Sequence, residues 1–370
     1  EFYKVGSSLA QIRNKRPVKI NNGEVLLTAS YKDNGTLYSL GNAGADGKEN
    51  GYWQYFHPGG EKMSEGYFIN GSKDGEWKYY YDSGLPSTVE HYSGGKLNGE
   101  YTGYHTTGKI SVKGNFADNE VEGTVTWYNP FGIISKTLVY KDNVPDGEGR
   151  TYYQSSQLME KYTLVNGKFE GEHLTYFPDG NLSIRASYKD GDMVGQYLEY
   201  YPDGIISVQG SYKSGREDGE WKFYYPDGRL SREQNYSAGT ITGSYKEYNK
   251  NGIPRMECTY DASGGLQGKS VYYDRYGRKI FEEEYQDNKI VRITSGFNNP
   301  SGPVSFGRQD GTFSFSIFTV DGKLRSKGSY EKGVATGEQV FYYRNGKPRQ
   351  VATIKDGQYS GEMKTFHVNG

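Results

Sequence analysis

GEWKFYYPDGRLSREQNYSAGTIT, residues 219–242, contains the whole pattern that decides the fold. It opens with residues rich in Trp, Phe and Tyr, which are typical of β-strands. Pro226, Asp227 and Gly228 then predict a tight hairpin loop, because Pro pre-sets φ for a type I turn and Gly accepts the positive φ that follows. A return strand and a second turn at Gly239 complete the unit.

The same unit recurs along the chain with a period of 24 residues, and GEHLTYFPDGNLSIRASYKDGDMV (171–194) is a second clear copy. A Gly or Pro arrives about every ten residues, which argues against helices. The sequence therefore predicts an all-β fold, a repeat array of antiparallel β-hairpins that forms a long twisted meander sheet. With position 1 as the opening residue, the copies begin at Gly51, Gly75, Gly99, Gly123, Gly147, Gly171, Gly195, Gly219, Gly243, Gly268, Phe313, Gly337 and Gly361.

These copies divide the chain into four parts. Residues 1–50 hold a degenerate N-terminal repeat that acts as a cap, followed by a Gly/Asn/Asp-rich stretch, 38–50, that predicts a flexible loop. Residues 51–291 hold ten regular repeats, 292–312 form an irregular insertion or decayed repeat, and 313–370 hold two repeats and a partial one. At about 9–10 Å of advance per repeat, the ten regular units would extend roughly 95 Å before twisting.

Alternation along the strands predicts which side chains are buried. Position 6 is aromatic in these copies, position 12 is often Ile or Leu, position 16 is often small, and position 18 is mostly aromatic. We expect these four positions to form one packed face, with Tyr200 and Tyr224 at position 6 buried and Tyr225 at position 7 exposed. Positions 3 and 7 supply rings to the opposite face, and the candidate binding residues there are Trp53, Trp77, Tyr81, Tyr101, Tyr197, Tyr201, Trp221, Tyr225 and Tyr245.

Composition limits the classes of function. Aromatic residues make up 15% of the chain and the formal net charge is -1, which argues against disorder. The evenly mixed charges argue against nucleic acid as a partner and against docking on anionic membranes. No apolar stretch approaches the roughly 20 residues that span a bilayer. The single cysteine, Cys258, excludes an intrachain disulfide. We favour an extracytoplasmic location, in the periplasm or cell envelope.

No sequence motif indicates catalysis or a cofactor. Residues 263–270, SGGLQGKS, nearly match a phosphate-binding loop, but the first glycine is missing and a strand, not a helix, follows the lysine. His57 and His105 lie two repeats apart, about 19 Å, which is too far for one metal ion. His91 with His105 is the one histidine pair that merits a check. The glutamates at position 2 share one environment, whereas a catalytic pair needs two. We expect no enzymatic activity, no cofactor and no metal.

The unit that opens GEWKFYYPDG at Gly219 and continues to Tyr236 and Gly239 resembles the MORN repeat variant, found in bacterial proteins often labelled YwqK-type antitoxins. The resemblance covers roughly 51–291 and 313–370, and more faintly 14–37. It implies a meandering antiparallel sheet and contact with other molecules. MORN-like proteins are associated with protein scaffolding, and lipid contact has been proposed for some.

We interpret the chain as a non-enzymatic binding or scaffolding protein that uses its aromatic-rich face. A protein partner is the first expectation. A glycan-binding or cell-envelope module is the alternative, because rows of Trp and Tyr also stack on sugars. A hydrolase is the remaining alternative.

The two edges of such a sheet differ in sequence. The N-terminal edge contains residues that oppose further strand pairing, namely Arg13, Lys15, Arg16 and Pro17. Residues 361–370, GEMKTFHVNG, contain no such cluster of charges and proline. We therefore predict that 361–367 is an exposed edge strand, at which the natural chain continues or pairs with another molecule, including a second copy.

Overall fold

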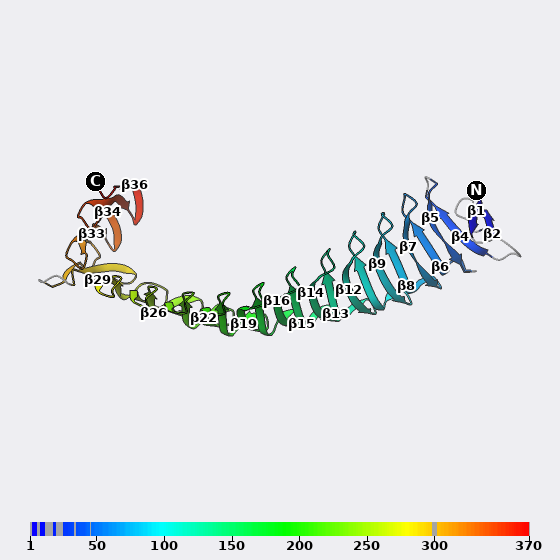
Figure 1. The fold of residues 1–370 in the computed structure, drawn as a ribbon, viewed down its shortest axis with the longest axis horizontal. Coiled ribbons are helices and arrows are strands. Elements are labelled where there is room, and N and C mark those ends of the chain that lie inside the picture. The colour runs from blue at the N-terminus through cyan, green and yellow to red at the C-terminus, as the bar shows by residue number, and fades with distance from the viewer. Residues whose placement is uncertain are drawn as a thin grey trace. The chain divides into compact units, whose positions relative to one another are not determined.

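The computed structural model describes residues 2–5, 8–11, 18–19, 25–32, 35–44, 46–297 and 302–369. These residues form β-strands and turns, without a helix. The chain divides into two compact units, Glu1–Asn181 and Leu182–Gly370. Within each unit, most strands pair antiparallel with the strands that precede and follow them along the chain (Figure 1). The predicted all-β array of antiparallel hairpins is confirmed. The basic and proline residues predicted to protect the N-terminal edge (13–17) lie outside the described residues.

The described residues of the first unit form eighteen strands, and among these β1 and β2 pair with each other alone. The strands are β1 (Phe2–Val5), β2 (Ser8–Gln11), β3 (Val18–Lys19), β4 (Val25–Tyr31), β5 (Leu37–Ala43), β6 (Glu49–Phe56), β7 (Lys62–Ile69), β8 (Ser72–Tyr80), β9 (Pro86–Ser93), β10 (Lys96–Leu97), β11 (Gly99–Tyr104), β12 (Ile110–Ala117), β13 (Glu120–Tyr128), β14 (Ile134–Lys141), β15 (Val144–Tyr152), β16 (Leu158–Val165), β17 (Lys168–Phe169) and β18 (Gly171–Tyr176).

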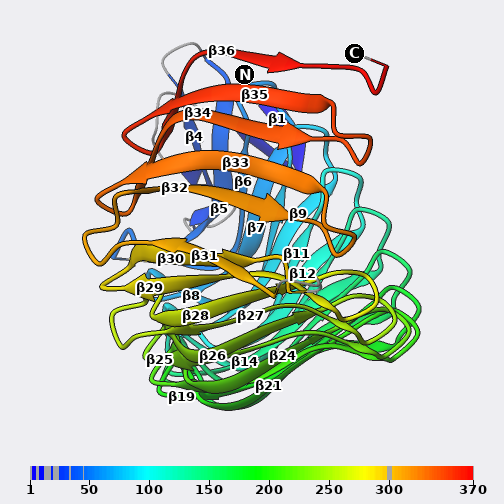
Figure 2. The ribbon, with the colours of Figure 1, turned by 90° about the vertical axis from the view of Figure 1, so that its left-hand side faces the viewer.

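The second unit ends in a separate five-stranded sheet, β32 to β36, whose strands lie in chain order (Figure 2). The strands of this unit are β19 (Leu182–Lys189), β20 (Asp192–Met193), β21 (Gly195–Tyr200), β22 (Ile206–Lys213), β23 (Arg216–Glu217), β24 (Gly219–Tyr224), β25 (Leu230–Ser237), β26 (Thr240–Tyr248), β27 (Pro254–Tyr260), β28 (Gly268–Tyr273), β29 (Lys279–Gln286), β30 (Lys289–Ser295), β31 (Val304–Gly307), β32 (Phe313–Phe318), β33 (Leu324–Glu331), β34 (Val334–Tyr342), β35 (Pro348–Lys355) and β36 (Gln358–Thr365).

The hairpin loop forms as its residues predict. In the unit that begins at Gly219, the backbone N–H of Tyr225 donates to the carbonyl of Arg229 and the N–H of Gly228 donates to the carbonyl of Tyr225, both at 2.8 Å. Gly228 has φ 79°, the conformation for which glycine is suited. Asp227 Oδ1 accepts the N–H of Arg229 at 3.1 Å, which closes the loop from the side-chain side.

A bulge at position 13 changes which side chains share a face. Phe223 at position 5 pairs with Arg232 at position 14, but Tyr224 at position 6 pairs with Leu230 at position 12. One residue on the return strand therefore has no partner, and the alternation of side chains reverses there. Side chains at positions 3, 5, 14, 16 and 18 therefore lie on one face of the sheet, called the inner face below. Side chains at positions 6 and 12 lie on the opposite, outer face.

The predicted packed face is therefore wrong in half of its positions. Positions 16 and 18 are on the packed side, but positions 6 and 12 are not, because strict alternation does not account for the bulged residue. Tyr200 and Tyr224 are half-buried, as is Tyr225. The core forms instead at position 3 and at position 16, with side chains exposed by 9% or less at Trp53, Trp77, Val125, Leu138, Tyr162, Ala186, Trp221, Cys258, Phe315 and Ala352.

Residues 38–50 are not the flexible loop that their composition predicts. Most of them belong to β5 and β6, which pair with each other. Gly41 pairs with Trp53, and a Cβ at Gly41 would lie 2.2 Å from the Trp53 ring. Because glycine has no side chain, the Trp53 ring can lie directly over the backbone at Gly41.

The irregular segment and the C-terminal edge are both strands in part. Within 292–312 the described residues include the end of β30 and all of β31, which pair with each other. Among the described residues, β36 pairs with β35 alone. The strand is exposed along its whole length, as predicted for an edge.

Candidate functional site

The tryptophans predicted for the binding face lie inside the array. Trp77 is only 1% exposed, and its ring covers Gly66 of the preceding repeat, where a Cβ would lie 2.4 Å from the ring. Trp221 is 5% exposed and covers Gly210 in the same way. A large side chain at position 3 thus fills the space that a small one at position 16 leaves.

The other position-3 rings of that predicted face are partly buried on the same side. The Tyr197 ring stacks on Trp221 with centroids 5.7 Å apart, and burial raises the pKa of Tyr197 to about 12. Burial also raises the pKa of Tyr101 and that of Tyr245. These residues contribute to packing between repeats, which leaves little of them for a partner to touch.

Where position 7 is a tyrosine, and at His57 and His105, its side chain links one repeat to the next. The Tyr225 hydroxyl donates to the backbone carbonyl of Tyr248, the position-6 residue of the following repeat, at 2.8 Å. His57 and His105 use Nε2 for the same contact, with the carbonyls of Tyr80 and Tyr128. The remaining predicted binding residues, Tyr81, Tyr201 and Tyr225, make this contact. The sequence alone does not reveal the contact. The tyrosines that donate to a position-6 carbonyl are Tyr81, Tyr153, Tyr201, Tyr225 and Tyr343.

Glu65 joins two repeats on the outer face. Its carboxylate accepts hydrogen bonds from Tyr52, from Tyr80 at 2.5 Å, from Lys62 at 2.7 Å and from Gln54 at 3.1 Å. Burial alone would raise the pKa of Glu65, but these hydrogen bonds outweigh it and lower the pKa to about 2.

This cluster predicts acid sensitivity. Since the folded-state pKa of Glu65 lies below the ordinary 4.5, its contribution to stability is complete above about pH 4.5 and is lost as the pH falls toward 2. We expect Glu65→Gln to lower the free energy of unfolding by about 1–2 kcal/mol at pH 7, because a charged acceptor is lost. Urea titrations across this pH range should show a shallower acid decline in the variant. Parallel declines for variant and wild type would contradict this role of Glu65.

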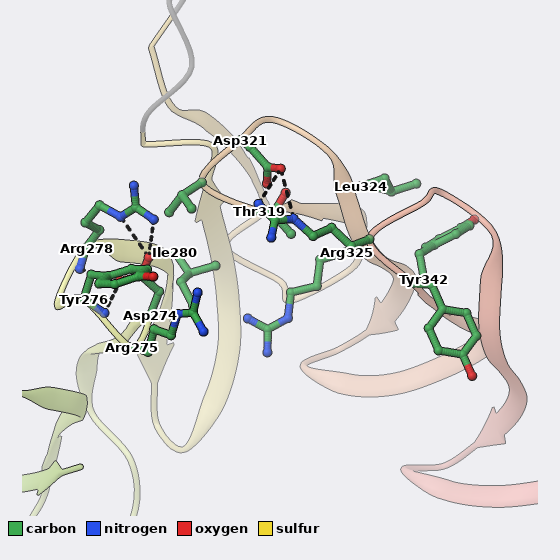
Figure 3. A pocket seen from close by; sticks show the side chains of 13 residues that line it. Asp274, Arg275, Tyr276, Arg278, Ile280, Thr319, Asp321, Leu324, Arg325 and Tyr342 are labelled. Atoms are coloured by element: carbon green, nitrogen blue, oxygen red, sulfur yellow. Dashed lines mark hydrogen bonds and ion pairs between the residues drawn. The ribbon is translucent and has the colours of Figure 1, made fainter. Parts of the chain in front are cut away.

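The second unit contains two cavities where β28–β30 and their turns face the sheet β32–β36. An open cleft of about 450 Å³ lies between the turn 274–278 and residues of β33 and β34 (Figure 3). An inner cavity of about 410 Å³ lies beside it, and Arg325 and Tyr342 line both. Ile290, Ile293, Phe315 and Ile317 pack together as the core that connects the two sheets at this point.

Tyrosine and arginine dominate the rim of the open cleft. Tyr276 is 61% exposed, and the guanidinium carbons of Arg275 and Arg278 lie 4.7 and 5.2 Å from its ring centroid. Arg278 pairs with Asp274 at 2.8 Å. On the opposite wall, Arg344 pairs with Asp321 at 3.2 Å. Among the described residues, no carboxylate pairs with Arg275 or Arg325, so the cleft carries a surplus of positive charge.

The inner cavity combines rings, two arginines and one acid. Glu283 accepts hydrogen bonds from the hydroxyls of Tyr272 at 3.0 Å and Tyr285 at 2.9 Å, and burial raises its pKa. Arg325 and Arg349 also line the cavity. Desolvation, and then the charge of Arg349, lower the pKa of Arg325.

Glu283, Arg325 and Arg349 depart from the repeat pattern in the sequence. Position 13 is serine in most of the regular copies, but it is arginine at 325 and 349. Position 16 is small or apolar in most copies, yet at Glu283 it is an acid. The sequence-based site prediction missed all three, because it sought the most regular residues.

Neither a metal-binding group nor a phosphate loop forms among the described residues. Among the residues that the structure describes, no three His, Cys, Asp or Glu side chains are grouped so that they could hold a metal ion. Lys269 of the near phosphate-loop sequence lies in β28 and pairs with Glu282 at 2.8 Å. In the described part of the chain, no helix is long and apolar enough to cross a membrane.

Comparison with known proteins supports the repeat assignment. Six segments match the MORN repeat variant: 97–118, 169–190, 193–214, 217–238, 241–262 and 335–356. Each begins at the end of one 24-residue copy and continues through the next, so these six copies match the MORN repeat variant in period and phase. No curated protein matches the chain.

Solved structures resemble the chain only weakly. The crystal structure of TcdB2-TccC3 is 14% identical, with 90% of this chain and 20% of that chain covered and a TM-score of 0.17. The Photorhabdus luminescens Tc holotoxin pore with the TccC3 D651A mutation is 15% identical, with 88% and 18% covered and a TM-score of 0.16. This chain thus spans about a fifth of their length. TM-scores this low assign neither fold nor function.

Proposed function

We propose that this chain is a MORN-repeat protein and a non-enzymatic binding protein that docks an acidic segment of a protein partner in the open cleft of its second unit. The observation that carries the proposal is the Tyr/Arg rim of a cleft of about 450 Å³. Tyr and Arg are enriched at protein interfaces and dominate their binding energy. The nine residues predicted for binding from the sequence either pack between repeats or donate a hydrogen bond to the following repeat.

The unpaired arginines of the open cleft favour a partner segment with negative charge. Asp274 and Asp321 neutralise Arg278 and Arg344, which leaves Arg275 and Arg325 available to a carboxylate from outside. Arginine binds carboxylates through two parallel hydrogen bonds. The exposed Tyr276 ring supplies an apolar contact beside them. The partner segment is therefore expected to carry Asp or Glu next to an aromatic or aliphatic residue.

Selection from random linear peptides displayed on phage tests the proposal with the full chain as bait. We expect the enriched peptides to pair an acidic with an apolar residue. Arg275→Glu and Tyr276→Ala should each weaken the best peptide at least tenfold in a titration, that is about 1.4 kcal/mol. Arg229→Glu, at a corresponding turn of another repeat, is the matched control and should bind as the wild type does. Enriched peptides without acids, or undiminished binding to Arg275→Glu, would refute the proposal.

A further inference from the structure

The inner cavity of the second unit is a separate feature from the open cleft. Its apolar wall comes from both sheets, with Phe281 and Ile293 on one side and Phe315, Ile317 and Phe341 on the other. Its volume, about 410 Å³, falls in the range of small-molecule sites, about 300–1,000 Å³. Rings and aliphatic side chains with a few polar groups are the usual lining of such a site.

The polar groups of this cavity are mainly cationic. Arg325 and Arg349 occupy the same repeat position, 24 residues apart, on β33 and β35 of one sheet, with β34 between them, and both line the cavity. Among the described residues, neither pairs with a carboxylate. By contrast Arg255, at the same repeat position, pairs with Glu247 at 2.8 Å. Two guanidinium groups that line one cavity without a paired carboxylate repel each other, and an added anion stabilises both.

Glu283 is the one acid that lines the cavity, and it does not neutralise the arginines. Its carboxylate accepts the hydroxyls of Tyr272 and Tyr285 instead. Gln339 Nε2 is likewise engaged, since it donates to the carbonyl of Ser329 at 3.1 Å. Among the described residues, the two arginines of the cavity therefore have no carboxylate partner.

We propose that the inner cavity binds a small organic anion, a compound with one carboxylate or sulfonate on an apolar, ring-sized body. Arg325 and Arg349 bind the anionic group, and the rings of Phe281, Phe315 and Phe341 contact the body. This inference shares Arg325 with the proposed protein contact. Arg349 and Ala335 line the inner cavity and not the open cleft, so variants of these two residues test the inference separately.

Fluorescence titration of the full chain with 8-anilinonaphthalene-1-sulfonate, an apolar sulfonate, tests this inference. We expect saturable binding that 2-naphthoate displaces and the uncharged 2-naphthol does not. Arg349→Gln and Arg325→Gln should each weaken binding at least tenfold. Arg255→Gln, at the same repeat position but outside the cavity, should leave the affinity unchanged.

A second variant locates the probe. Ala335→Leu places a larger side chain in the cavity wall and should abolish the binding that 2-naphthoate competes for. Circular dichroism and thermal melting check that each variant is folded, and we expect the arginine variants to fold because Arg255, Arg325 and Arg349 are all exposed. Wild-type affinity in Arg349→Gln, or displacement by 2-naphthol as effective as by 2-naphthoate, would overturn the proposal.

Discussion

Trp77→Ala is expected to lower the free energy of unfolding by about 3–5 kcal/mol, the usual cost of removing a buried tryptophan. The ring is 1% exposed and meets Phe68 edge-on with centroids 4.9 Å apart. Its indole N–H donates to the carbonyl of Tyr67 at 2.9 Å. Lys73 Nζ lies 4.6 Å from the ring centroid, which adds a cation–π contact. Truncation removes all of these contacts and leaves a cavity between two repeats.

Chemical denaturation of the full chain measures this loss, and Tyr67→Ala is the matched control. Tyr67 belongs to the same pair of repeats but is 56% exposed on the outer face. Its loss should cost less than about 1 kcal/mol, as surface substitutions usually do. Similar losses from the two substitutions would mean that position 3 is not the inner face.

Gly66→Ala should destabilise the chain by about 2–3 kcal/mol, a large effect for one methyl group. The added Cβ would lie 2.4 Å from the ring of Trp77, so the indole or the strand must move. The ring is enclosed by its neighbours and has little room to yield.

A double-mutant cycle isolates this contact. In the Trp77→Ala background the ring is absent, so Gly66→Ala should be neutral or stabilise the chain by up to about 1 kcal/mol, because alanine restricts the unfolded backbone more than glycine does. Denaturation of the wild type, the two single variants and the double variant supplies the four values. Additive costs would show that Gly66 is needed for its backbone and not for the ring.

Local features of the fold could be predicted from the sequence. Strand and turn follow from short-range chemistry, and Pro226, Asp227 and Gly228 form the loop that they predict. The faces could not be assigned by alternation, because the bulged residue at position 13 reverses the pattern between Leu230 and Arg232. Gly41 shows the same limit, since a glycine that looks flexible in sequence lies under the Trp53 ring.

The candidate site was harder to predict from the sequence than the local features of the fold. Trp77 and Trp221 look like contact residues in sequence, yet a large ring opposite a glycine is as favourable for packing as for binding. The arginines at 325 and 349 were visible as departures from the repeat. Their shared cavity was not, because it depends on how the sheet β32–β36 packs against Ile290 and Ile293.

Hydrogen exchange of the full chain with and without the selected acidic peptide tests the central claim most directly. The proposed function predicts that protection on binding is confined to the turn 274–278 and to residues 319–325 and 342–344, which line the open cleft. The position-3 strands β8 and β24 should exchange at unchanged rates. Protection along β8 or β24, with none at 274–278, would contradict the cleft as the binding site.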